Sequence, residues 1–319
     1  MPNDMPLSDW LGFLDKEYLS TFIMEGGGSI KFVATTEDLK PELRNAIVGR
    51  SGELDYIVIN VDAAVSRVHM PQDIFFEMAS QVDWRVLARR LVLQLASDRG
   101  HRVDSIDPND SGNIFKAIGE TNDLTSEYVY LGLSPQIQDK VYRNPQMAKD
   151  FRVAMAQLCI QEDTREGQQY GGQPLIDWLT GSNTRVSSVR PFLIYNAINR
   201  TTARHFIESA VYWFQYVGHA GTVLLLDNSR VTLARNPRDG RRYYTKAMVM
   251  EHYELLREFV DGTDRLLGTL IVVLTNDEFL DEDLRSRGYG SYPALMTRVI
   301  DDVRDRTLVN PIASLIRLT

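Results

Sequence analysis

The sequence predicts an α/β protein with a mostly parallel β-sheet. Residues 56–62, 221–227 and 269–274 are apolar runs that lead into polar residues, as expected of strands buried on both faces of a parallel sheet. Between the first two runs, Leu87 and Leu91 begin a series of leucines at every fourth residue, which indicates an amphipathic helix with one buried face. The chain therefore combines buried strands with surface helices.

Length and composition indicate an ordinary globular protein. The chain has 319 residues, of which 44% are hydrophobic and 24% charged, and its formal net charge is -8 at pH 7. An acidic chain does not attract nucleic acid through its overall charge. Its single cysteine, Cys159, excludes an internal disulfide, and the scattered histidines lack the spacing of metal ligands, so we expect no metal site. No apolar run approaches the roughly 20 residues of a membrane span, so we expect a cytoplasmic protein without membrane contact.

The first strand of the expected sheet covers residues 29–33. It follows a helix over residues 8–24, in which Trp10, Leu14 and Tyr18 fall on one face, and a turn of three glycines. If the sheet bound a nucleotide, a loop of the pattern G-x-x-x-x-G-K-[ST] would come next, because its glycines let backbone N–H groups approach phosphate.

Residues 34–42 do not match a phosphate-binding loop. They contain no glycine, and Glu37 and Asp38 would repel a triphosphate. Lys40 is followed by Pro41, which cannot donate a backbone N–H. We interpret this stretch as the start of a short helix without a phosphate site.

The middle of the chain predicts a mainly helical insertion at about residues 100–190, within a single domain of residues 1–319. A polar loop over residues 97–113 precedes helical pieces over residues 114–160. A long amphipathic helix over residues 192–217 then leads back into the sheet.

The strand over residues 221–227 has the form of a Walker B segment, which brings a magnesium-binding carboxylate to a nucleotide phosphate. Its apolar core is followed at once by Asp227. The next predicted strand, residues 269–274, is followed by Thr275 and Asn276, and Asn276 stands where a sensor residue would touch a γ-phosphate or the attacking water.

Two groups of arginines have open interpretations. Arg298 lies near the start of a predicted helix and could act in trans as an arginine finger, or pair with Asp301 or Asp302 on its own helix. A basic loop interleaved with tyrosines could contact phosphate or nucleic acid, or remain solvated. Its arginines considered for nucleic-acid contact are Arg238, Arg241 and Arg242.

Four segments recur in an order that resembles a known family. They are Glu-Gly-Gly-Gly-Ser-Ile-Lys-Phe-Val (25–33), Pro-Leu-Ile-Asp-Trp-Leu-Thr-Gly (174–181), Gly-Thr-Val-Leu-Leu-Leu-Asp (221–227) and Gly-Ser-Tyr-Pro-Ala-Leu-Met-Thr-Arg-Val (290–299). Together they resemble the BREX-system ATP-binding domain family, AAA+-like P-loop proteins encoded with bacterial anti-phage defence genes. The resemblance spans nearly the whole chain.

The resemblance implies an AAA+-like P-loop NTPase core, ATP binding and hydrolysis, oligomerisation and, in some members, DNA engagement. This chain departs from the pattern twice. The family's Gly-Lys-Ser/Thr loop should follow the strand ending at Val33, and no such loop is present. The family's Walker B pair is Asp-Glu; Asp227 matches the first position, but Asn228 stands at the second. An amide cannot take a proton from water, and loss of such a base costs on the order of 10²-fold or more in rate.

The favoured hypothesis is a catalytically silent ATPase-like subunit with vestigial Walker motifs, requiring no cofactor. It would serve as an assembly or regulatory platform for a protein partner of the same defence system, such as an active ATPase paralogue, in a homo- or hetero-oligomer. One alternative is an active or nucleotide-binding ATPase whose ATP and magnesium bind at a non-standard phosphate site. Another alternative is a DNA-binding module that uses the basic loop.

Overall fold

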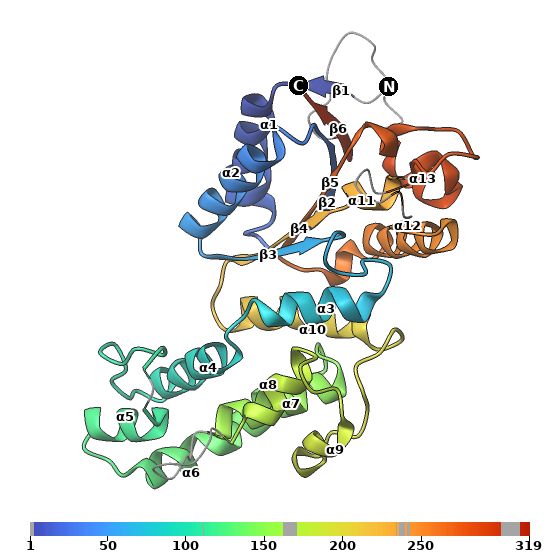
Figure 1. Cartoon of the computed structure of the whole chain (residues 1–319). Coiled ribbons are helices and arrows are strands. Elements are labelled where there is room, and N and C mark those ends of the chain that lie inside the picture. Colours follow the sequence, from blue (N-terminus) through green and yellow to red (C-terminus); the bar gives the residue numbers. More distant parts are fainter. Residues whose placement is uncertain are drawn as a thin grey trace. The chain divides into compact units, whose positions relative to one another are not determined.

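One part of the chain is built around a parallel β-sheet in the computed structural model, which describes residues 3–110, 112–161, 171–233, 235, 240, 243–300 and 313–319 (Figure 1). Within these residues the sheet has six strands, and all of their pairings are parallel. In sheet order the strands are β1 (Asn3–Met5), β6 (Leu315–Leu318), β2 (Gly28–Ala34), β5 (Thr269–Thr275), β4 (Gly221–Asp227) and β3 (Tyr56–Asp62). The predicted α/β class with a parallel sheet is confirmed.

The strand order determines which residues meet at the carboxyl edge of the sheet. β5 lies between β2 and β4, so the strand that should precede a phosphate loop and the strand that ends in Asp227 flank a common neighbour. Ala34 pairs with Thr275, and Asp227 pairs with Leu274. The loops after these three strands therefore share one edge, as a P-loop-like core requires.

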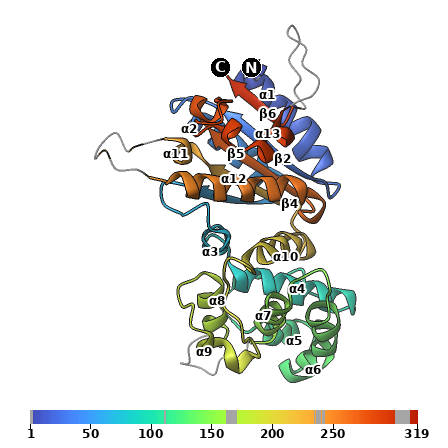
Figure 2. The ribbon, with the colours of Figure 1, turned by 90° about the vertical axis from the view of Figure 1, so that its right-hand side faces the viewer.

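Helices cover both faces of the sheet (Figures 1 and 2). One face carries α1 (Leu7–Phe13), a π-helical continuation (Leu14–Phe22) and α2 (Lys40–Glu53). The other carries α12 (Lys246–Asp261) and α13 (Pro293–Val299). The predicted stripe of Trp10, Leu14 and their neighbours packs on the first face against strand residues such as Val33 and Val272. Burial of these apolar side chains fixes α2, and with it the loop after β2.

The chain divides into two units, the first formed by residues 1–77 and 219–319 and the second by residues 78–218. Most of the second unit is helical. Its helices are α4 (Trp84–Asp98), α5 (Ile114–Thr121), α6 (Ser126–Ile137), α7 (Lys149–Ile160), α8 (Gln173–Leu179), α9 (Val186–Val189) and α10 (Ala203–Tyr216), and α3 (Pro71–Ser80) ends in it. The helical insertion predicted at about 100–190 lies inside this unit.

The long helix predicted over residues 192–217 is wrong in its first half. α10 begins only at Ala203, because Leu193 has a left-handed backbone (φ 65°) that ends the preceding turn. Residues 194–199 then run without regular structure, although Ile194 and Ile198 are buried. The apolar residues at helical spacing in this stretch are therefore buried residues of a loop and do not form a helix. No helix among the described residues is long and apolar enough to cross a membrane.

A buried histidine fixes the loop after β3. His252 of α12 is fully buried, and its Nδ1 lies 2.9 Å from the carbonyl oxygen of Val68. Because a carbonyl oxygen can only accept, Nδ1 carries the proton and donates it. The Tyr244 hydroxyl donates to the carbonyls of Ala63 and Ser66 in the same loop. Burial lowers the pKa of His252 to about 4, so the ring is neutral at pH 7.

This burial predicts a specific loss of stability in mild acid. The unfolded chain binds the proton more tightly than the folded one, so the contribution of His252 is retained above pH 6.5 and lost as the pH falls toward 4. Between pH 7 and pH 5 the wild type should lose about 2 kcal/mol of unfolding free energy more than His252→Gln, whose amide can still donate to Val68. Urea unfolding at both pH values measures this difference. His205→Gln, at an exposed position, is the control, and an equal pH dependence of all three proteins would contradict the assignment.

Candidate functional site

The candidate site lies at the carboxyl edge of the sheet, after β2, β5 and β4. Open α/β sheets bind their ligands at this edge. The structure brings Asp227, Asn228 and Asn276 together there, and it adds Lys40 and Arg44 from α2. Sequence reasoning had excluded Lys40, because the loop has no glycine and Pro41 follows the lysine, and it did not consider Arg44.

Lys40 stands where the lysine of a phosphate-binding loop would stand. Counted from the end of β2, the pattern G-x-x-x-x-G-K-[ST] places Ala34 and Leu39 at the glycines, Lys40 at the lysine and Pro41 at the hydroxyl residue. The spacing from Ala34 to Lys40 was the signal that could have identified it. The loop thus keeps the cation of the motif and lacks its other functional residues.

The Lys40 ammonium group makes its contacts with groups of the protein itself. Its side chain is only 7% exposed, and Nζ contacts the Glu37 carboxylate and the Ser229 hydroxyl. It also lies 3.6 Å from Oδ1 of Asp227. A buried cation is stable only when acceptors surround it, and here the chain supplies them all.

The Asp227 carboxylate is likewise satisfied by the chain itself. Arg44 approaches Oδ2 at 3.2 Å, opposite the Lys40 contact at Oδ1. The backbone N–H and hydroxyl of Ser229 donate to Oδ1 at 3.1 and 2.7 Å. Two cations and two donors therefore occupy the carboxylate that a Walker B strand would offer to magnesium.

The loop after β2 does not form a phosphate cradle. The N–H of Thr35 donates to the Thr275 carbonyl at 3.0 Å. The N–H groups of Leu39 and Lys40 both turn back to the Thr36 carbonyl at 3.3 Å. Pro41 has no N–H, and a triphosphate needs such donors free and convergent. The described residues therefore do not fit a magnesium–nucleotide complex in this conformation.

Asn228 is buried without side-chain partners. It is fully buried, and within the described residues neither its side-chain oxygen nor its nitrogen has a hydrogen-bond partner. Its backbone N–H donates to Leu274, which places it beside Thr275, whose buried hydroxyl also lacks a partner there. A neutral amide has no basicity for proton transfer. This position therefore holds polar groups but no general base.

Asn276 holds the loops of the site together. Its side-chain oxygen accepts from the Thr232 hydroxyl at 2.8 Å, and its nitrogen donates to the Ser229 carbonyl at 3.1 Å. The same oxygen accepts from the N–H of Phe279, which caps the short 3₁₀ turn Asp277–Leu280. Both ends of this amide are engaged, so in this conformation it ties α11 (Ser229–Thr232) to the loop after β5.

Arg298 lies on α13 and pairs with a residue of another helix. Its Nε is 2.5 Å from Oδ1 of Asp261 on α12, and its Nη1 donates to the Ala294 carbonyl. The hydrogen bond from Arg298 holds the pKa of Asp261 below its ordinary value. The alternative partners Asp301 and Asp302 lie outside the described residues.

The basic loop after α11 was the predicted nucleic-acid contact. Arg238, Arg241 and Arg242 lie outside the described residues. At the described edge of that loop, the Arg230 guanidinium stacks 4.6 Å from the centre of the Tyr243 ring. Among the described residues no group of three or more His, Cys, Asp or Glu side chains could hold a metal ion.

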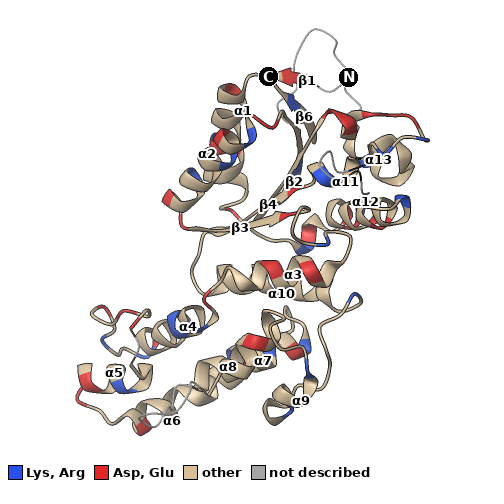
Figure 3. Cartoon of the chain, viewed as in Figure 1, with Lys and Arg blue, Asp and Glu red and all other residues tan. Residues whose placement is uncertain are grey.

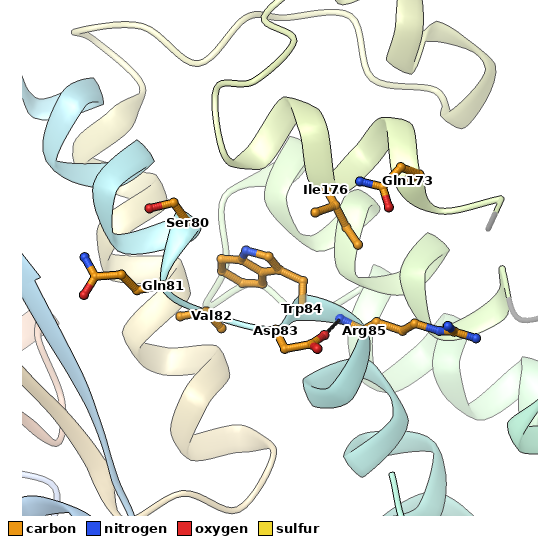
Figure 4. A pocket seen from close by; sticks show the side chains of 8 residues that line it. All are labelled: Ser80, Gln81, Val82, Asp83, Trp84, Arg85, Gln173 and Ile176. Carbon is orange, nitrogen blue, oxygen red and sulfur yellow. Dashed lines mark hydrogen bonds between the residues drawn. The ribbon is translucent and has the colours of Figure 1, made fainter. Parts of the chain in front are cut away.

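A separate hollow of about 500 Å³ lies in the helical unit (Figure 4). Its Asp83 carboxylate accepts from the N–H groups of Arg85 and Val86 and so caps α4, and its Trp84 nitrogen donates to the Ala79 carbonyl. These polar groups stabilise the helix and leave no catalytic pairing. The residues that line the hollow are Ser80, Gln81, Val82, Asp83, Trp84, Arg85, Gln173 and Ile176.

Comparison with known proteins identifies the family. The model of the family described as BREX system ATP-binding protein BrxC/D matches residues 116–319. The chain belongs to this family. The match includes Asp227, Asn228, Asn276 and Arg298, whereas Lys40 and its loop precede it. Searches of curated proteins and of solved structures found no match.

Membership of the BrxC/D family has two direct consequences. The chain is a component of a BREX anti-phage system, and other components of that system accompany it. The family is described as ATP-binding, which agrees with the α/β core and with the position of Asp227 at the end of β4. The family assignment inferred from the sequence is confirmed, by a match over residues 116–319.

The buried pair of Lys40 and Asp227 should contribute to stability in a coupled way. Lys40→Met leaves part of a buried carboxylate uncompensated and should cost about 3 kcal/mol of unfolding free energy. In the double variant Lys40→Met/Asp227→Asn the cost should be below the sum of the single costs by about 1 kcal/mol or more. Chemical denaturation of the four proteins measures the coupling. Lys16→Met, which removes an exposed ion pair, should cost under about 1 kcal/mol, and strict additivity at Lys40 and Asp227 would refute the coupling.

Proposed function

We propose that this BrxC/D family member is a catalytically silent ATPase-like subunit that serves as an assembly or regulatory platform in its BREX complex. The observation that carries the proposal is the ion-paired Asp227. An ATPase keeps this carboxylate available for magnesium, whereas here Lys40, Arg44 and Ser229 occupy it. The internal cations take the place that a metal ion would otherwise fill.

The loop after β2 supports the same conclusion independently. A phosphate loop acts through free N–H groups, and those of Leu39 and Lys40 are bonded within the loop itself. Glu37 adds a negative charge beside Lys40, which disfavours a triphosphate. Asn228 in turn offers no base. The loop after β2 disfavours phosphate binding, the ion-paired Asp227 disfavours metal binding, and Asn228 does not support proton transfer.

The hydrogen bonds around the site also support a platform role. Asn276 joins the loop after β5 to α11 through hydrogen bonds with Ser229 and Thr232, and these bonds need no ligand. Hydrogen bonds within the chain thus give a protein partner a defined surface to recognise. We infer that the partner is a protein of the same defence system, with an active ATPase paralogue as one candidate.

One observation favours a second candidate function, nucleotide binding. Lys40 keeps the place of the phosphate-loop lysine. If Lys40 exchanged its contacts with Glu37 and Ser229 for a phosphate, the chain would bind ATP without hydrolysing it quickly, because Asn228 lacks basicity. The two candidates differ in affinity for nucleotide.

Nucleotide binding and hydrolysis separate these candidates. With purified full-length protein and magnesium–ATP, we expect no heat of binding in calorimetry and no phosphate release above a protein-free blank. Lys40→Ala and Asp227→Ala should leave both readings unchanged. A magnesium-dependent ATPase rate that Asp227→Ala abolishes would overturn the silent-subunit proposal. If the wild type instead binds ATP without hydrolysing it, and Lys40→Ala abolishes that binding, the second candidate is established.

Co-purification with the products of neighbouring genes, with nucleotide content measured on the complex, tests the platform role.

A further inference from the structure

The helical unit carries a segment with an unusual surface. Residues 185–200, here called the arginine strap, expose Arg185 and Arg190 together with two large apolar side chains. Leu193 is 53% exposed and Tyr195 is 60% exposed. The chain has 43 acidic residues, yet none lies between Trp178 and Ile207, and this stretch has no lysine either. Its positive charge therefore comes from arginine, without neighbouring carboxylates in the sequence (Figure 3).

The arginines at the start of the strap have no internal counter-ion. Arg185 precedes α9, and Arg190 begins the 3₁₀ turn Arg190–Phe192. Within the part of the chain that the structure describes, neither guanidinium lies within ion-pair distance of a carboxylate. Several other exposed arginines are paired within the chain, as Arg67 is with Asp73 and Arg143 with Asp139. The strap thus offers cations to an external partner.

Buried side chains and a hydrogen bond to α7 anchor the backbone of the strap. Val189 and Ile194 are fully buried, and the Asn196 amide donates to Oδ2 of Asp150 on α7 at 2.7 Å. Leu193 has a left-handed backbone, which costs a non-glycine residue about 1–2 kcal/mol. The Leu193 side chain is exposed although the next residue, Ile194, is fully buried. In Figure 1 the strap begins at α9 and continues from there toward α10.

This composition fits a protein partner better than nucleic acid. The centres of protein interfaces are enriched in Arg, Tyr and apolar residues and depleted in Lys, Asp and Glu, as the strap is. A chain with net charge -8 is repelled by a polyanion beyond a few local contacts. The partner should instead be a protein surface that combines carboxylates with an apolar side chain.

The same chain carries such a surface in its first unit. Residues 278–284, here called the acidic segment, expose Glu278, Asp281 and Asp283 and end in Leu284, which is 64% exposed. Asp281 and Asp283 accept backbone N–H groups at 2.9 and 2.8 Å, and within the described residues none of the three carboxylates is paired with a cation. By contrast, the neighbouring Asp277 pairs with Arg317. The acidic segment thus matches the strap in charge and in its exposed leucine.

We propose that the arginine strap of one copy binds the acidic segment of a second copy of this chain. Arg185 and Arg190 would form bidentate pairs with Asp281 and Asp283, and Leu193 and Tyr195 would pack against Leu284. The two surfaces are different, so the contact is heterologous. Each added copy leaves one strap and one acidic segment available, and the assembly stops growing only when the rotation between copies closes a ring. The inference builds on the proposed platform role by naming a partner, and it is tested by association alone, without any nucleotide reading.

Charge reversal with rescue provides the test. Sedimentation velocity of the full chain at low salt should show self-association that weakens as salt rises. Arg185→Glu/Arg190→Glu and, separately, Asp281→Arg/Asp283→Arg should each raise the dissociation constant about tenfold or more. A mixture of the two variants should associate again, because the reversed strap faces a reversed acidic segment. Tyr195→Ala should weaken association without changing its salt dependence.

A matched control and two contrary outcomes make the test decisive. Arg102→Glu/Arg143→Glu reverses two exposed arginines of the same unit outside the strap and should leave association unchanged. Circular dichroism confirms that each variant is folded. A wild type that stays monomeric, or variants that fail to rescue each other, would overturn the proposal. Binding of a fluorescent single-stranded DNA, lost in the strap variant while self-association is absent, would assign the strap to nucleic acid and overturn it as well.

Discussion

The organisation of the candidate site depends on one electrostatic constraint: the charge of the Asp227 carboxylate, whose side chain is only 13% exposed, must be compensated. A carboxylate at the end of a buried parallel strand is costly unless donors or cations surround it. Nucleotide-binding proteins meet this cost with magnesium, and this chain meets it with Lys40, Arg44 and Ser229. Since those three groups come from α2 and α11, the ion pairs also hold both elements against the sheet edge.

The sheet topology makes this compensation available. Because β5 separates β2 from β4, the loop after β2 approaches Asp227 across the end of β5 and not from an adjacent strand. The side chain of Lys40 spans that distance, and Arg44, one helical turn further on α2, reaches the second carboxylate oxygen. The resulting contacts leave no N–H group of Leu39 or Lys40 pointing at the site. Loss of the phosphate cradle and neutralisation of Asp227 are therefore two results of one rearranged loop.

Much of the fold could be predicted from the sequence, because buried parallel strands are continuous apolar runs. Strands β3, β4 and β5 match the predicted runs, and Asp227 and Asn276 lie at the predicted edge. The prediction for residues 192–202 was wrong, because apolar spacing does not distinguish an anchored loop from a helix when a single residue such as Leu193 takes a left-handed backbone. Lys40 was missed for a different reason. Its role depends on Asp227, far away in the sequence, and only the folded chain brings the two charges together.

The uncharged side chain of Asn228 is compatible with the ion pairs that Lys40 and Arg44 make with Asp227. A glutamate at this fully buried position would need a proton, a cation or a metal nearby, and Lys40 and Arg44 are already used by Asp227. An amide carries no charge, so Asn228 tolerates burial beside Thr275 at the smaller cost of unpaired polar groups. The substitution at Asn228 is thus compatible with the capture of Asp227 by Lys40, whereas a glutamate would compete for the same cations. The loop after β2 and the end of β4 therefore depart from the ATPase pattern in a mutually consistent way, because the same two cations that compensate Asp227 are unavailable to a second carboxylate at position 228.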